Sequence, residues 1–321
     1  MNIPVFDLHC DTVTELLGRD LAGKTSLRSN ALHIDLERGG TLAGYAQCFA
    51  FWSTTGLPLP KGLKPEDIFW REVSILQDAI DKNSDLVRQA RTPEDIRKNL
   101  AEGVISAIFT LEGPAGIGFE PAKLEKLYNL GFRISTLGWN EKNSLTGSHV
   151  TGGGLTKRGR EYIKECQRLG ILVDVSHISD EAFWQIMDIT EAPIIASHSN
   201  SRSVYDVSRN LTDDMFKAIC ETGGVAGYNL CAEFTGDLPT LDTVCDHILH
   251  FLELDPSGKH IALGGDLDGI EHMPEGFTGI QDYPHLAARL LERGVEEGMV
   301  RDIFWNNALG VMECAVRNHQ K

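Results

Sequence analysis

The chain has 321 residues, of which 42% are hydrophobic and 24% are charged, and its formal net charge is −16. This composition is typical of a folded globular protein and excludes a disordered chain. The excess of acidic residues disfavours a nucleic-acid partner, because it would repel a phosphate backbone and no Lys/Arg-rich face compensates for it.

The N-terminal segment lacks the basic stretch and the apolar stretch of a secretion signal. No apolar run reaches the ~18 residues that a membrane span requires. We therefore expect a cytoplasmic protein with no membrane partner. The seven cysteines form no Cys-x-x-Cys pair, and an odd number suits reduced thiols better than disulfides. The sequence leaves a monomer and a homodimer open.

Short β-rich runs alternate with longer stretches of helical periodicity along the whole chain. The expected strands are 4–8, 43–51, 104–111, 132–137, 171–176, 193–197, 224–229 and 260–265. The expected helices are 65–90, 121–129, 155–169, 179–189, 212–222, 239–253, 283–293 and 296–316. Eight such units predict an α/β fold, a single (β/α)8 barrel of the TIM type that occupies residues 1–321 as one domain.

Side chains of the metal-ligand type follow directly after five of these expected strands. They are His9 and Asp11, Glu112, His177, His198 and Asp266. The active site of such a barrel is built from the carboxyl ends of the strands and the loops that follow. The six residues are therefore expected to meet at one mouth of the barrel.

The spacing of His9 and Asp11 places both side chains on the same face of an extended segment, so that they can bind one cation. Cys10, between them, is expected to point away into the core. Imidazole and carboxylate ligands suit zinc or a similar divalent metal. Glu112 has two oxygens and could join that ion to a second one held by His177 and His198. Two neighbouring metal ions are a recurrent hydrolytic device.

Each of these residues also has a structural interpretation when taken alone. A single histidine after an apolar run is often a hydrogen-bonded core residue, and Glu112 could cap a helix or form a salt bridge. Asp266 and Asp268 could form a turn within GGDLDG, because Asp and Gly favour turns. The joint placement of the residues at one end of the strands favours the metal site.

The sequence around these residues resembles the membrane (renal) dipeptidase family, zinc peptidases of the amidohydrolase superfamily. The matching blocks are DLHCDT (7–12), TLEGP (110–114), VDVSHIS (173–179), PIIASHSNSR (193–202), SRNLTDD (208–214) and GGDLDG (264–269). They occur in order over nearly the whole chain.

The resemblance implies two Zn²⁺ ions, or another divalent metal, in each chain of a metallohydrolase. His9, Asp11 and Glu112 would bind the first ion, and Glu112, His177 and His198 the second. A metal-bridged hydroxide would then hydrolyse the peptide bond of a dipeptide, while Asp266 handles the protons. Arg209 would bind the C-terminal carboxylate of this small-molecule substrate, which its guanidinium fork matches.

The chain departs from the family at one position. Many members carry a histidine after the fourth strand, thought to contact the reacting group, where TLGWN places Trp139 as the substrate-binding residue. An indole N–H can donate one hydrogen bond but cannot titrate.

Three alternatives stay open. Arg209 could form a surface salt bridge with Asp213 or Asp214. The same metal site could serve an amidohydrolase-type deacylase or lactonase. The barrel could also be catalytically silent and act as a binding or scaffold protein.

Overall fold

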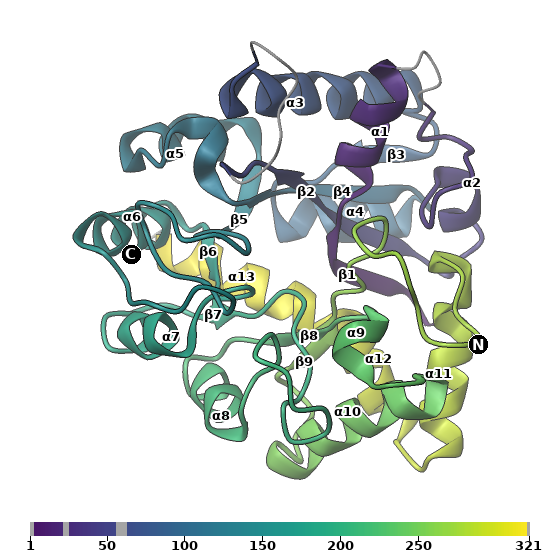
Figure 1. The fold of residues 1–321 in the computed structure, drawn as a ribbon. Helices are drawn as coiled ribbons and strands as arrows, with labels where there is room; N and C mark the ends of the chain where they lie inside the picture. Colours follow the sequence, from purple (N-terminus) through teal and green to yellow (C-terminus); the bar gives the residue numbers. More distant parts are fainter. Residues whose placement is uncertain (1–2, 22–25, 56–62, 320–321) are drawn as a thin grey trace.

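The computed structural model describes residues 3–21, 26–55 and 63–319. Its central feature is a barrel of eight parallel strands surrounded by helices (Figure 1). The strands are β1 (Val5–Cys10), β2 (Tyr45–Trp52), β4 (Ile105–Glu112), β5 (Phe132–Thr136), β6 (Leu172–Asp174), β7 (Ile194–Ile195), β8 (Ala226–Tyr228) and β9 (Ile261–Leu263). Each coincides with one of the eight expected runs, so the expected (β/α)8 class is confirmed.

The strand order closes the sheet almost completely. Hydrogen-bonded neighbours follow the order β7-β6-β5-β4-β2-β1-β9-β8. The remaining gap, between β7 and β8, is spanned just beyond the end of β7. There the Ala196 N–H donates to Val225 O at 3.0 Å, and the Gly227 N–H donates to Ala196 O at 2.7 Å. These bonds bring the segment after β7 beside β8.

The surrounding helices are α1 (Thr12–Leu21), α2 (Leu36–Gly39), α3 (Pro65–Lys82), α4 (Pro93–Ala101), α5 (Leu124–Leu130), α6 (Lys157–Leu169), α7 (Asp180–Met187), α8 (Asp213–Glu221), α9 (Ala232–Thr235), α10 (Leu241–Leu254), α11 (Tyr283–Glu292), α12 (Glu297–Arg301) and α13 (Asn307–His319). Helix α13, yellow in Figure 1, runs behind the barrel. Trp305, just before it, packs on Phe6 of β1 with ring centroids 5.7 Å apart. Both belong to a buried apolar cluster that joins α13 to several strands. This cluster fills the inside of the barrel, and α13 covers it at one end.

The helix expected over 65–90 is too long, because the chain leaves the helix after Lys82. Asn83 ends α3 with a non-helical backbone, in a polar segment that favours a turn. The chain then forms β3 (Val87–Gln89), which pairs with β4 outside the barrel path. Sequence periodicity could not separate this short strand from the helix, because three residues are too few for a pattern.

A β-bulge in β1 directs His9 toward the barrel axis. Phe6 and Leu8 belong to the cluster inside the barrel, so strict alternation would turn His9 outward. Between Asp7 and Cys10 the register with β2 shifts by one residue. Cys10 therefore packs in the outer apolar cluster, as expected, while His9 faces the site. Bulges commonly re-aim side chains next to active sites.

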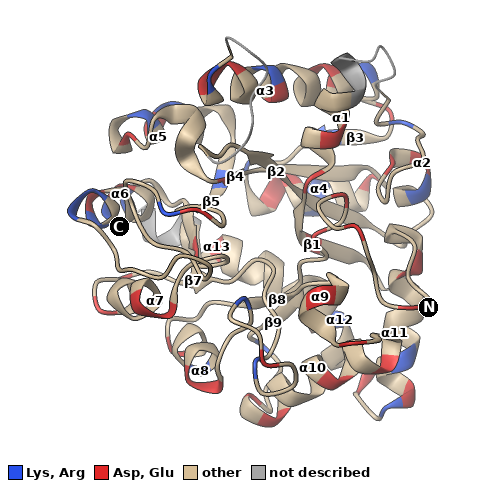
Figure 2. Ribbon diagram, in the orientation of Figure 1, with Lys and Arg blue, Asp and Glu red and all other residues tan. Residues whose placement is uncertain are grey.

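Charged residues of both signs are interspersed along the outer helices, with acidic residues in excess (Figure 2). No helix among the described residues has the length and the apolar character needed to cross a membrane.

Candidate metal centre

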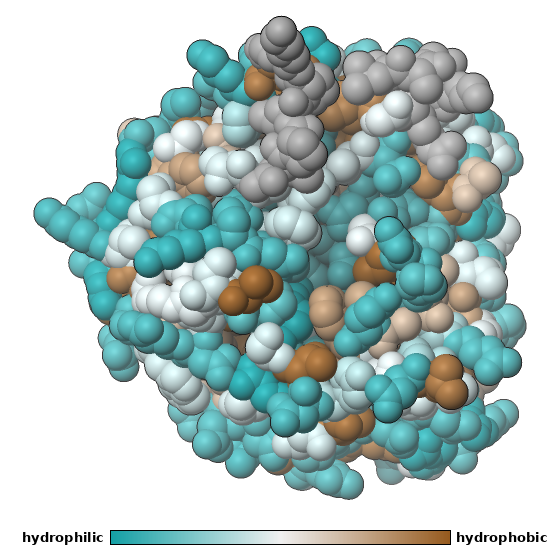
Figure 3. Space-filling model, in the orientation of Figure 1, coloured by the Kyte–Doolittle hydropathy of each residue, from teal (hydrophilic) through white to brown (hydrophobic). Residues whose placement is uncertain are grey.

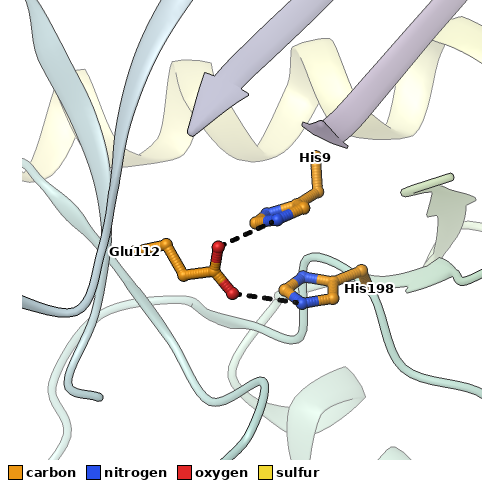
Figure 4. A group of neighbouring side chains, drawn as sticks. All are labelled: His9, Glu112 and His198. Atoms are coloured by element: carbon orange, nitrogen blue, oxygen red, sulfur yellow. Dashed lines mark ion pairs between the residues drawn. The ribbon is translucent and has the colours of Figure 1, made fainter. Parts of the chain in front are cut away.

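Glu112 lies at the end of β4, and its carboxylate points into the space between β1 and the segment after β7 (Figure 4). Oε2 lies 3.4 Å from Nε2 of His9. Oε1 lies 3.1 Å from Nε2 of His177 and 3.8 Å from Nε2 of His198. The short helical turn that follows β4 begins after Gly113, so Glu112 is not its cap. The two oxygens of one buried carboxylate thus face different histidines, as a bridging ligand would require.

His177 and His198 point their Nε2 atoms at each other across only 2.9 Å. The opposite nitrogen of each ring has a partner: Nδ1 of His177 donates to Asn140 Oδ1 at 2.9 Å, and Nδ1 of His198 donates to Ser197 Oγ at 2.6 Å. Burial lowers the pKa of both rings well below the ordinary value, and the Arg209 charge adds to this. Two neutral rings with occupied Nδ1 atoms present two lone pairs to each other, which a shared cation would stabilise.

The carboxylates of Asp11 and Asp266 complete the surroundings of His9. Asp11 Oδ2 lies 3.4 Å from Nε2 of His9, and Asp266 Oδ1 lies 3.8 Å from it. Burial and the neighbouring Glu112 raise the pKa of Asp11 to about 6. Burial also raises the pKa of Asp266 to about 7, although His9 opposes the shift. Burial alone lowers the pKa of His9, but Glu112 and Asp11 raise it well above the ordinary value.

This donor set fits divalent metal ions of the zinc type. Nε2 of His9 is buried and has no hydrogen-bond partner in the part of the chain that the structure describes. Three carboxylates that repel one another surround it. Two overlapping groups, His9–Glu112–His198 and His9–Asp11–Asp266, have ligand atoms within 4.8 Å of one another. Zinc binds imidazole and carboxylate ligands, and cations would relieve the repulsion.

Two of the candidate residues lie on strained backbone. His177 has φ 69° and Asp266 has φ 57°, the left-handed region that residues other than glycine rarely adopt. Such a conformation costs about 1–3 kcal/mol and is found mainly at functional sites. The barrel therefore holds these two side chains in place against a local cost.

Arg209 is buried near the site and only part of its guanidinium is used. Nη1 donates to Ser199 Oγ at 2.6 Å, and the group lies 5.7 Å from the Phe234 ring centroid. Nε and Nη2 are buried without a hydrogen-bond partner among the residues that are described. The surface salt bridge considered for Arg209 is wrong, because the residue is only 4% exposed and Asp213 instead pairs with His250.

A cavity of about 490 Å³ opens beside these residues. Figure 3 shows a hollow with hydrophilic residues near the centre of this face. Trp139 lines the cavity and packs edge-on against Trp52, with ring centroids 4.9 Å apart. Asp11, Glu112, His177 and Asp266 also line it, together with acidic side chains such as Glu233. These four candidate residues therefore lie where a small molecule can reach them.

Comparison with known proteins assigns the chain to a family. A model of the membrane dipeptidase family, peptidase family M19, matches residues 1–321. The chain belongs to this family. This membership agrees with the resemblance found in the sequence blocks.

Relatives in the M19 family differ in how much of their length is shared. An "Uncharacterized dipeptidase" of Schizosaccharomyces pombe is 38% identical over 214 residues, which cover 64% of this chain and 52% of that protein. The "Dipeptidase verJ" of Clonostachys rogersoniana is 31% identical over 300 residues, covering 88% of this chain and 75% of that protein. The match thus spans about half the length of the yeast protein.

The fold also matches a solved structure. A metallopeptidase from Rhodobacter sphaeroides, crystallised with a phosphinate mimic of the dipeptide L-Ala-D-Ala, superposes with a TM-score of 0.89 and 27% identity. The match covers 98% of this chain and 99% of that one. The similarity extends over the whole barrel.

Four side chains that orient the candidate ligands in this M19 chain were not predicted from the sequence. Asn140 accepts from His177, and Ser197 links His198 to the buried Asp174. Asn229 donates from Nδ2 to Asp266 Oδ2 at 2.9 Å. Asp174 and Ser197 lie within the matching blocks, which was the available signal. Asn140 and Asn229 lie outside those blocks, so only the fold reveals them.

Proposed function

We propose that the chain is a dipeptidase that binds two divalent metal ions, preferably zinc. His9, Asp11 and Glu112 would hold one ion, and Glu112, His177 and His198 the other. The observation that carries this proposal is the placement of Glu112, whose two oxygens face different histidines. When bound, such a pair of ions supplies Lewis acidity and lowers the pKa of water, so that hydrolysis can proceed near neutral pH.

The residues around the ions have separate tasks. Asp266 has one oxygen on Asn229 and the other facing His9, so it can take up and return a proton at Oδ1. The unpaired nitrogens of Arg209 would bind the C-terminal carboxylate of the substrate. Acidic groups such as Glu233 in the cavity lining suit the cationic amine at the other end of a dipeptide. The ligand of the Rhodobacter sphaeroides relative, a dipeptide mimic, belongs to the same class.

The proposal is tested with metal-loaded protein and a panel of L,L- and L,D-dipeptides, dipeptide amides, tripeptides, N-acyl amino acids and lactones. We expect dipeptides to be hydrolysed and the amides and tripeptides to be poor substrates, because both lack a free carboxylate at the required distance from the scissile bond. Turnover of lactones or N-acyl amino acids without dipeptide cleavage would favour the deacylase or lactonase instead. Tight metal binding without any turnover would favour a binding protein.

A further inference from the structure

A second group of metal-ligand side chains lies at the opposite end of the barrel. Cys220 is in the last turn of α8, Asp255 follows the end of α10, and His260 lies directly before β9. One ligand atom from each residue lies within 4.8 Å of those of the other two. The candidate metal centre follows the carboxyl ends of the strands, whereas this group lies at their amino ends. The two sites are therefore separate.

The ring of His260 is oriented for metal binding. Its Nδ1 lies 2.7 Å from the carbonyl oxygen of Gly224, and since a carbonyl can only accept, Nδ1 carries the proton. In the neutral ring, Nε2 then presents its lone pair. A backbone carbonyl that fixes the tautomer in this way is the usual support of a metal-binding histidine.

Only one oxygen of the Asp255 carboxylate accepts hydrogen bonds from the described residues. Oδ1 accepts hydrogen bonds from the Ser257 N–H at 3.1 Å and from the Ser257 hydroxyl at 2.6 Å. Oδ2 is buried and has no hydrogen-bond partner in the described parts of the chain. A buried carboxylate oxygen without a donor is unfavourable, and a cation would stabilise it.

Cys220 supplies the sulfur. Its burial and the neighbouring Asp255 raise the pKa of the thiol to about 12, so the thiol stays protonated without a metal. A bound cation reverses this preference, because the thiolate is the form that coordinates metals. All three residues are half-buried, which leaves the group accessible from solution.

The geometry points to a divalent metal site of the zinc type formed by Cys220, Asp255 and His260. One thiolate, one imidazole and one carboxylate leave room for water as a fourth ligand, and this mixture suits zinc or cobalt rather than magnesium or calcium. A cysteine–histidine hydrolytic triad is a poorer interpretation, because the third group on His260 is the carbonyl of Gly224 and not Asp255. The ion would tie α8 and α10 to the start of β9.

Cobalt(II) added to the metal-free full-length protein distinguishes this site from the candidate metal centre. Only a thiolate ligand gives a sulfur-to-cobalt charge-transfer band in the near ultraviolet, and His9, Asp11, Glu112, His177 and His198 contain no sulfur. We expect the band in the wild type and its loss in Cys220→Ser, with one ion fewer bound per chain. Cys314 is another half-buried cysteine, and the control variant Cys314→Ser should keep both the band and the ion.

Two further measurements keep the test decisive if Cys220→Ser folds poorly. Asp255→Asn retains the shape of the side chain and should weaken cobalt binding. In the wild type, zinc should protect Cys220 but not Cys314 from alkylation, as measured by mass spectrometry. Absence of the band, or a band that survives Cys220→Ser and disappears in Cys10→Ser, would overturn the proposal. None of these readouts depends on peptidase activity, so the proposed function can fail or hold independently.

Discussion

Asp266 differs from the other carboxylates beside His9 because one of its oxygens has a donor of its own. Asn229 holds Oδ2, and Oδ1 is directed toward His9. We expect Asp266→Asn to retain both ions, since the principal ligand set does not include Asp266, and to lower kcat by about 10²–10⁴, the usual contribution of a positioned acid or base. Metal analysis and steady-state kinetics of the variant test this. Turnover close to that of the wild type would assign Asp266 to the turn alone.

Arg209 keeps two guanidinium nitrogens buried and unpaired among the described residues, which is costly unless a ligand binds them. We expect Arg209→Met to raise KM for dipeptides, and to lower kcat too if the contact aligns the scissile carbonyl. The substitution should lower kcat/KM much less for dipeptide amides, which lack the carboxylate, than for dipeptides. An equal loss for both substrate types would show that Arg209 acts only on the structure of the site.

At the level of elements, two glycines allow the segment after β7 to lie beside β8 and β9. A Cβ atom on Gly264 would lie 1.7 Å from the carbonyl oxygen of Ser197, and one on Gly227 would lie 2.0 Å from it. His198 follows Ser197 directly. The closure of the barrel and the position of a candidate ligand therefore depend on the same close packing.

This packing predicts that Gly264→Ala destabilises the protein by about 1–3 kcal/mol, the usual cost of overpacking, and weakens metal binding through the displaced His198. Gly310→Ala is the matched control, because nothing lies within 4 Å of the added methyl in α13. It should be neutral or stabilising by up to about 1 kcal/mol, since alanine favours helices. Denaturant unfolding and metal titration of the two variants provide the comparison. Equal stability of the two variants would contradict the packing argument.

Helix α3 carries a buried carboxyl group, Glu72, whose Oε1 accepts from Thr14 at 3.1 Å while Oε2 has no partner in the described ranges. Burial raises its pKa well above the ordinary value of 4.5. The folded, metal-free protein thus keeps a proton that the unfolded chain releases above pH 4.5. The free energy of unfolding therefore falls as the pH rises above 4.5.

We therefore expect the metal-free wild type to lose stability relative to Glu72→Gln as the pH rises above 4.5, because glutamine stays neutral. Denaturant unfolding at several pH values measures the difference. The surface substitution Glu297→Gln should leave the profile of the wild type unchanged. Parallel pH profiles for the wild type and Glu72→Gln would contradict the prediction.

Across the whole molecule, the sequence predicted what depends on local pattern and missed what depends on contact. All eight barrel strands and the convergence of six ligand-type residues follow from where apolar runs end. The bulge that turns His9 inward and the contact of Asn140 with His177 were not predictable, because both depend on neighbours distant in sequence. The metal-binding roles themselves stay predictions.

The candidate ligands belong to β1, to β4 and to the turns after β6 and β7, so ions bound there would join distant parts of the barrel. We expect chelation to lower the thermal midpoint, because a ligand that binds only the folded state stabilises it by about 2.7 kcal/mol at 100 times its Kd. Zinc should restore the midpoint, and magnesium should not, since it prefers oxygen ligands. His198→Gln should show a smaller zinc-dependent rise of the thermal midpoint than the wild type. Cys220→Ser should keep the part of this rise that comes from the candidate metal centre. Calorimetry of the three proteins with and without zinc measures these shifts; equal midpoints with and without zinc in the wild type would exclude a tightly held metal pair.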